Sequence, residues 1–344
     1  MRHIRLGSIG LALAITLSGC INEDNEDCEV DFTARYDMHL VTNEGTELNT
    51  VLGAEADIYA RQALSNHLRD IFSDYGRDLR LAFYDAEAST ALQRADEHEM
   101  NATSATYAMR LSPHAYLHTA LANVRDNGPV SVKGGSDSAT HALSQQDADT
   151  VPSHGTGLFT ARLPMRLATS KGQTFDVSLY MANCSAALVV DTVRCATMTG
   201  MRVASTGFAT SMTVADSLYH FAQKFPMVRA PRVAVDDGAE QVYCSVSFPS
   251  RDPAGTRVVT ETTAPFEADE AESVLWQVHA YVSLADGTVT QTILSLKKPL
   301  RAGQLKIIKG YVDESGAVRT DDMEVAVSVQ LEWAPGISQE VPLG

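Results

Sequence analysis

The sequence lacks a surplus of basic residues. It contains 27 Lys and Arg against 43 Asp and Glu among 344 residues, which gives a formal net charge of −16. Nucleic-acid binding needs a basic face that neutralises phosphates, and broad docking on anionic lipid needs one as well. We therefore expect no nucleic-acid partner, and the acidic balance has an ordinary explanation as a charged, solvated surface.

Cysteine and aromatic residues are also scarce. Five cysteines in 344 residues are too few for a disulfide scaffold. Aromatic residues make up 7% of the chain, which speaks against a carbohydrate-binding surface built from exposed aromatic platforms. Hydrophobic residues make up 44% and charged residues 20%, a globular composition, and the length suggests about two domains.

Motifs for catalysis and metal binding are missing too. The chain has neither a Gly-x-Ser-x-Gly elbow nor a His-Glu-x-x-His pair. His114 and His118 have the spacing that would place two ligands on one helix face, but Pro113 precedes them and no third ligand is evident. We therefore expect no catalytic residue, no metal and no cofactor.

The only long apolar run lies at the N-terminus. Arg2 and Arg5 precede a mostly apolar stretch over residues 9–17, which is too short to span a bilayer of about 30 Å. The stretch ends in a sequence that resembles a bacterial lipobox, formed by Leu17, Ser18, Gly19 and Cys20. The pattern predicts a lipoprotein signal peptide over residues 1–19 and a diacylated cysteine at position 20.

A lipidated, acidic tether is expected over residues 20–28. Two acyl chains on Cys20 would supply stable membrane attachment at about 0.8 kcal/mol per buried methylene. The residues that follow resemble the acidic surface-export signals of Bacteroides-type lipoproteins, and a plain solvated linker is the alternative; the acids are Glu23, Asp24, Glu26, Asp27, Glu29 and Asp31. We expect a surface-exposed protein anchored by lipid in the outer membrane.

The remainder of the chain has mostly the period-two alternation of half-buried strands. Asp286-Gly287 lies between two such runs and predicts a hairpin, and residues 314–316 predict a second turn. The alternating segments cover residues 30–34, 79–84, 107–111, 159–165, 175–181, 242–248, 274–282 and 325–333.

One segment has a helical period. Leu64, Leu68 and Phe72 recur every four residues within 54–75, and a weaker helix is expected over 139–145. Residues 126–157 have the composition of a long surface loop. A helix packed on antiparallel strands predicts a mostly β protein with a β-sandwich and a helical crossover. A polar connector near residue 168 divides the chain into predicted domains 29–168 and 169–344.

The cysteines leave two alternatives open. Lipidation would remove Cys20 from the disulfide count and leave four thiols, which allow three pairings. Cys184 and Cys195 flank one strand-like run, so a bridge between them needs a turn. The possible disulfide partners, which could equally be four buried thiols, are Cys28, Cys184, Cys195 and Cys244.

The N-terminal pattern resembles the fimbrillin-associated anchor proteins (FimB/Mfa-type) of type V, Bacteroides-type fimbriae. The likeness is carried by Gly-Cys, an acidic spacer, a second cysteine and a first strand over residues 19–38, and it continues through 57–85, 158–165 and 177–191. The resemblance implies two consecutive transthyretin-like antiparallel β-sandwich domains, the first with the helical crossover. It also implies no catalytic activity, and a role in holding a fimbrial rod to the outer membrane and ending its growth.

The resemblance further implies a mechanism of strand exchange. In type V fimbriae an arginine-specific protease removes the first strand of a stalk subunit, and the C-terminal strand of the next subunit fills the groove. An anchor keeps its first strand, and Arg35, the first arginine after the lipobox, falls inside that strand. The candidate donor strand, which could equally be an ordinary strand of the second domain, presents Val325, Val327, Val329, Leu331 and Trp333.

Two alternatives to an anchor stay open. The first is a stalk or tip subunit of the same fibre, and the second is a surface glycan-binding lipoprotein. The expected partners of an anchor are a fimbrillin stalk subunit and, through the lipid, the outer membrane. Host or bacterial surfaces would be reached through the assembled fimbria.

Overall fold

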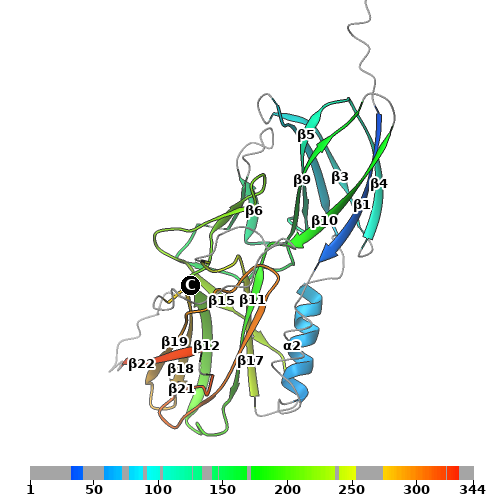
Figure 1. Ribbon diagram of the computed structural model, residues 1–344. Helices are drawn as coiled ribbons and strands as arrows, with labels where there is room; N and C mark the ends of the chain where they lie inside the picture. Colours follow the sequence, from blue (N-terminus) through cyan, green and yellow to red (C-terminus); the bar gives the residue numbers. More distant parts are fainter. Residues whose placement is uncertain are drawn as a thin grey trace, which may run out of the picture.

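The computed structural model describes residues 32–41, 58–71, 77–87, 91–100, 104–125, 127–133, 142–145, 147–168, 172–236, 240–252, 274–322 and 324–332. The predicted signal peptide, the lipobox, the tether, Cys28 and Trp333 lie outside these residues. The described residues form one α-helix and strands (Figure 1), which confirms a mostly β fold. None of their helices is long and apolar enough to cross a membrane.

The elements follow one another along the chain as follows. They are β1 (Phe32–Val41), α2 (Ile58–Ile71), β2 (Leu79–Asp85), β3 (Leu92–His98), β4 (Ser104–Leu111), β5 (Ala115–Ala122), β6 (Val130–Lys133), β7 (Ala142–Gln145), β8 (Thr150–Val151), β9 (Phe159–Arg166), β10 (Gln173–Met181), β11 (Cys184–Asp191), β12 (Met198–Thr206), β13 (Ser211–Thr213), β14 (Leu218–His220), β15 (Met227–Ala230), β16 (Arg232–Val233), β17 (Glu240–Ser247), β18 (Trp276–Leu284), β19 (Val289–Leu296), β20 (Leu305–Val312), β21 (Val318–Arg319) and β22 (Val325–Glu332).

A seven-stranded sheet occupies the upper part of the molecule in Figure 1, with the strand order β3-β2-β5-β9-β10-β1-β4. β1 lies inside it, parallel to β10 and antiparallel to β4. The side chains of this sheet that point inward, such as Leu81, Phe83 and Phe159, belong to one buried cluster. Alternation along the strands therefore produces the buried face that the sequence predicts.

Two further sheets pack face to face in the lower part. One has the order β16-β17-β11-β20-β21 and the other β22-β19-β18-β12-β15-β8. β11 is buried along nearly its whole length, because Ala187 and Val189 face the cluster that contains α2, whereas Leu188 and Val190 face the six-stranded sheet. A strand covered on both faces has a continuous apolar run, which explains why β11 does not alternate.

Helix α2 connects β1 to β2 and forms the predicted crossover. Its residues Ala60, Leu64, Leu68 and Ile71 are buried, at the helical spacing that the sequence predicts. They pack on β16 and β17, which belong to the second half of the chain, and Figure 1 shows the helix beside β17. The helix therefore joins the two halves in one core.

A buried polar network fixes the segment between the halves. The Asn183 amide oxygen accepts a hydrogen bond from the Leu158 amide at 3.2 Å, and its nitrogen donates to the Thr156 carbonyl at 2.9 Å. Asn123 donates to the Gly157 carbonyl at 2.9 Å, and the Gly157 amide donates to the Ile71 carbonyl at 2.8 Å. The side-chain amides of Asn183 and Asn123 thereby have hydrogen-bond partners, and the end of α2 is tied to the sheet junction.

Two local predictions are wrong. The predicted helix over 139–145 contains strand β7, and the predicted loop over 126–157 contains β6, β7 and β8. β7 pairs with β6 and with β13, and β13 lies almost seventy residues further along the chain. A short run of alanine, leucine and serine is compatible with either a helix or a strand. Pairing with the distant strand β13 stabilises the strand.

The seven-stranded sheet continues across the predicted boundary at residue 168. β9 ends before it, β10 begins after it, and the two strands pair with each other, with Tyr180 opposite Thr160. The polar connector is thus a link between adjacent strands. The division of the chain into two domains stays a prediction.

Trp276 is expected to be a major contributor to the stability of the lower core. Its side chain is 2% exposed, its ring lies 5.6 Å from that of Phe208, and its indole nitrogen donates to the Lys298 carbonyl at 3.0 Å. Trp276→Ala should lower the free energy of unfolding by about 3–5 kcal/mol, because it leaves a cavity and an unsatisfied carbonyl. Urea unfolding measures the change, and a loss below about 1 kcal/mol would contradict this packing.

Candidate functional site

β22 is the outermost strand of the six-stranded sheet. Among the described residues its one partner is β19, with which it pairs antiparallel: Val325 lies opposite Leu296, Val327 opposite Leu294 and Leu331 opposite Thr290. Val325 is buried, Val327 is 37% exposed and Val329 is half-buried, so the sandwich covers the apolar side chains of the strand unevenly. The candidate donor residues up to Leu331 therefore lie in an intramolecular edge strand, and Trp333 lies outside the described residues.

Four charged side chains hold the start of β22, and we call them the clasp: Lys298, Lys306, Asp322 and Glu324. The Lys306 ammonium lies 3.0 Å from an Asp322 carboxylate oxygen and 3.2 Å from one of Glu324. Lys298 donates to the other Glu324 oxygen. Sequence reasoning missed the clasp, because its lysines and acids are separated along the chain and meet only through folding.

The contacts of the clasp shift the pKa values of Glu324 and Lys306. The hydrogen bond from Lys298 lowers the pKa of Glu324, with a further contribution from Lys306. Burial opposes the charge of Lys306, but hydrogen bonds and charges of Asp322 and Glu324 outweigh it and raise its pKa. Both shifts favour the charged, paired state near neutral pH.

Glu324→Gln is expected to destabilise the protein by about 0.5–1 kcal/mol, because the clasp is partly exposed and screened. Since folding lowers the pKa of Glu324 below 4.5, its contribution is present above that value and is lost as the pH falls through the folded pKa. Urea unfolding at neutral and acidic pH measures both effects. Glu314→Gln, on the exposed turn, is the matched control; an equal loss in both variants would contradict the role of the clasp.

β1 is held on both sides. Arg35 lies opposite Thr174 of β10 and Ala108 of β4, and its side chain is exposed. Removal of β1 would separate β10 from β4 and leave two unpaired edges, the kind of groove that an incoming strand fills. β1 and β22 therefore differ: one is a two-sided inner strand, and the other is paired on one side.

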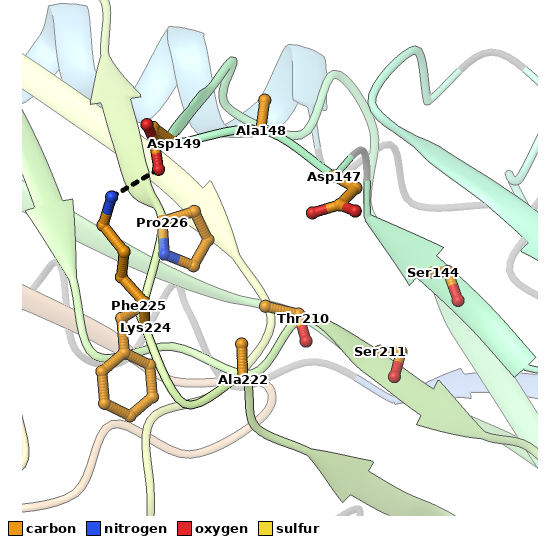
Figure 2. A pocket seen from close by; sticks show the side chains of 10 residues that line it. All are labelled: Ser144, Asp147, Ala148, Asp149, Thr210, Ser211, Ala222, Lys224, Phe225 and Pro226. Atoms are coloured by element: carbon orange, nitrogen blue, oxygen red, sulfur yellow. Dashed lines mark hydrogen bonds and ion pairs between the residues drawn. The ribbon is translucent and has the colours of Figure 1, made fainter.

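A polar cavity of about 560 Å³ opens beside β7 and β13 (Figure 2). Lys224 and Asp149 form an ion pair of 2.6 Å at its rim, and both side chains are more than four-fifths exposed. The remaining polar groups are the carboxylate of Asp147 and the hydroxyls of Ser144, Thr210 and Ser211. The cavity can hydrogen-bond a polar molecule, but it presents no nucleophile paired with a base.

The two histidines of the sequence motif do not share a helix. His114 precedes β5 and lies 3.1 Å from Asp85, whereas His118 is inside β5, stacked on Phe83 at 4.4 Å. Burial lowers the pKa of His118 to about 4, and its Nδ1 lies 3.1 Å from the Ala82 carbonyl oxygen. Within the described residues no group of three His, Cys, Asp or Glu could hold a metal ion.

The described cysteines are buried. Cys184 and Cys244 lie on the neighbouring strands β11 and β17, and Cys195 lies in the turn that follows β11. None of these three forms a disulfide in the described part of the chain. Cys28 falls outside it, so its pairing stays a prediction.

Comparisons with known proteins find similarity at the level of the fold. No protein-family model and no curated protein matches the chain. A protein of Bacteroides thetaiotaomicron, provisionally described as polysaccharide-binding, superposes with a TM-score of 0.50 at 10% identity, covering 85% of this chain and 97% of its own.

Two solved structures of Porphyromonas gingivalis proteins are also similar. The fimbrial anchor protein Mfa2 has a TM-score of 0.45 at 10% identity, covering 87% of this chain and 97% of its own. The tip fimbrial protein Mfa3, with a C-terminal truncation, has a TM-score of 0.38 at 9% identity, covering 88% and 100%.

Proposed function

We propose that this protein is a non-enzymatic outer-membrane lipoprotein that anchors a type V fimbria to the cell surface and ends its growth. The contact with the last stalk subunit is a strand exchange in which β22 is donated. The observation that carries the proposal is the one-sided pairing of β22 at the edge of its sheet, together with a lipobox at the other end of the chain.

The energetics of strand pairing support donation. In its own sheet, the backbone of β22 pairs with β19 along one side, and its other side has no partner among the described residues. In a groove between two strands the same backbone would pair along both sides, so the exchange replaces one ladder by two. The alternating side chains of Val325, Val327 and Val329 could fill pockets along such a groove. The clasp is the barrier that must open first.

The position of Arg35 supports an anchor rather than a stalk subunit. Arg35 is the fourth residue of β1, so cleavage after it would leave residues 36–41 of the strand in place between β10 and β4. A protease that cuts after arginine would thus leave most of β1 in its groove. A chain that keeps β1 offers no groove there for another subunit, and the fibre would stop at it.

The tether and the lipid supply the attachment in this proposal. Cys20 would carry diacylglycerol and a fatty acyl chain, and the acidic residues after it would give export to the surface and reach from the membrane.

A tip or stalk role in the same fibre is the alternative that shares this fold. A glycan-binding role is the other one, and the polar cavity of Figure 2 is the feature that favours it.

Affinity purification of the intact lipoprotein, followed by mass spectrometry, tests the proposal. The expected result is co-purification of a fimbrillin that forms a ladder of polymers on a gel. Recovery of glycan-uptake proteins alone would contradict the anchor and favour the glycan-binding alternative.

A further inference from the structure

Five of the six strands of the six-stranded sheet, all except β22, are free of acidic residues, although the chain holds 43 Asp and Glu. No Asp or Glu occurs in β8, β12, β15, β18 or β19, nor in the adjoining strand β16. Arginine is the only residue type in these strands that is charged at neutral pH. The charged side chains of these strands are therefore all cationic, in a molecule whose net charge is strongly negative.

Strand register brings two of these arginines together. Ala204 of β12 lies opposite Arg229 of β15, and Arg202 is two residues before Ala204 on the same face of its strand. Arg202 and Arg229 are thus diagonal neighbours, with Cα atoms roughly 7–8 Å apart. Both side chains are exposed, whereas Val203 and Ala230 between them turn into the core.

A third arginine reaches the same place from the other sheet. Arg232 of β16 lies opposite Tyr243 of β17, whose hydroxyl donates to the Met201 carbonyl at 3.2 Å. The three arginines line one groove of about 530 Å³, which we call the arginine groove. The groove also has an apolar floor, to which Met201 and Pro231 contribute accessible side chains.

No carboxylate of the described residues forms an ion pair with the guanidinium groups of the groove. Arg202 lies over the ring of Tyr281 at 5.9 Å, and no ion pair involves Arg202, Arg229 or Arg232 within the part of the chain that the structure describes. By contrast, Arg94, Arg125, Arg166, Arg301 and Arg319 each pair with an acid. Three guanidiniums that line one groove, without a paired acid among the described residues, are a site for anionic groups, to which each can donate two parallel hydrogen bonds.

We propose that the arginine groove binds an acidic peptide segment of a partner protein, in which carboxylates flank an apolar side chain. The carboxylates pair with the guanidiniums, and the apolar side chain covers the floor. The charged lining consists of guanidinium donors, and the side-chain acceptors of the groove are limited to the hydroxyls of Ser153 and Tyr243, so the carboxylates of a peptide match it better than sugar hydroxyls. Two strands, β18 and β19, separate this surface from β22, so the contact is distinct from strand exchange.

Fluorescence anisotropy with the folded protein and short labelled peptides tests the assignment. The probe alternates Glu and Leu, and its matched control alternates Gln and Leu. The wild-type protein should bind the Glu probe about tenfold or more tightly than the Gln probe, and raising the salt concentration should weaken that binding. Both comparisons use the unaltered protein, so they do not depend on the folding of a variant.

The variants locate the site. The triple variant R202Q/R229Q/R232Q should lose about tenfold or more in affinity for the Glu probe. The triple variant R94Q/R125Q/R166Q removes the same charge from exposed ion pairs of the seven-stranded sheet and should bind like wild type. Equal losses of affinity in both variants would show that binding depends on net charge alone, and this would overturn the proposal. Tighter binding of a sulfated or uronate polysaccharide than of the peptide would overturn the peptide assignment.

Discussion

A disulfide that joins β22 to β19 is expected to abolish incorporation of the protein into the fimbria. Ser295 and Ala326 lie directly opposite each other on the outer face of the sheet, so cysteines at both positions have nearly the Cβ separation that a disulfide needs. Once Ser295→Cys and Ala326→Cys are oxidised, β22 cannot leave its sheet, and a donated strand is no longer available. Loss of the stalk subunit from the purified complex measures the effect.

The control joins β19 to its other neighbour, β18, and leaves the pairing of β22 without a covalent link. Ser283 and Val289 are opposite residues of β18 and β19, close to the hairpin, and cysteines there leave β22 free. This variant should incorporate normally, and a reductant should restore incorporation of the Ser295→Cys/Ala326→Cys variant. If the oxidised β22 variant enters the fibre as wild type does, β22 is an ordinary strand of its own sheet and strand donation is refuted.

The hairpin between β18 and β19 shows what local sequence can determine. Gly287 has a φ of 85°, a conformation that glycine adopts without strain, and the Asp286 carboxylate accepts a hydrogen bond from the Thr288 amide at 2.8 Å. The glycine conformation and this hydrogen bond involve only residues 286–288. The prediction of a hairpin from Asp-Gly between alternating runs is confirmed for that reason.

Elements that depend on distant partners could not be predicted in the same way. The pattern of α2 predicts its buried stripe of Leu64 and Leu68, but not that the stripe packs on β17, some 170 residues later. The parallel pairs β1–β10 and β11–β20 likewise leave no local signal. In each case the sequence specifies which face is apolar, and the chain topology decides what covers it.

In the candidate functional site, too, the local pattern predicts the strand but not its partners. Alternation over residues 325–333 predicts a strand, and residues 325–332 form β22. The pattern does not distinguish a strand that remains in its own sheet from one that is donated to another subunit, because both need the same alternating side chains. The clasp and the arginine groove could not be predicted from the sequence, because each brings together charged residues from separate parts of the chain.

Cys20→Ala is expected to move the protein and its fimbria from the cell surface into the medium. Without the thiol no diacylglycerol can be attached, and the acyl chains that hold the protein in the membrane are lost. Immunoblots of cell and medium fractions measure the shift. Ser18→Ala is the matched control, since alanine also suits that position of the lipobox, and it should leave the protein on the cell.

The composition of the shed material separates attachment from capping. An anchor joined to the fibre through β22 predicts that Cys20→Ala protein in the medium co-sediments with polymerised fimbrillin. Adding the Ser295→Cys/Ala326→Cys pair should then release the protein without the fibre, because the strand that joins them is locked. Retention of the Cys20→Ala fimbriae on the cells would show that another component holds the rod, and the anchor role would be wrong even if strand exchange occurs.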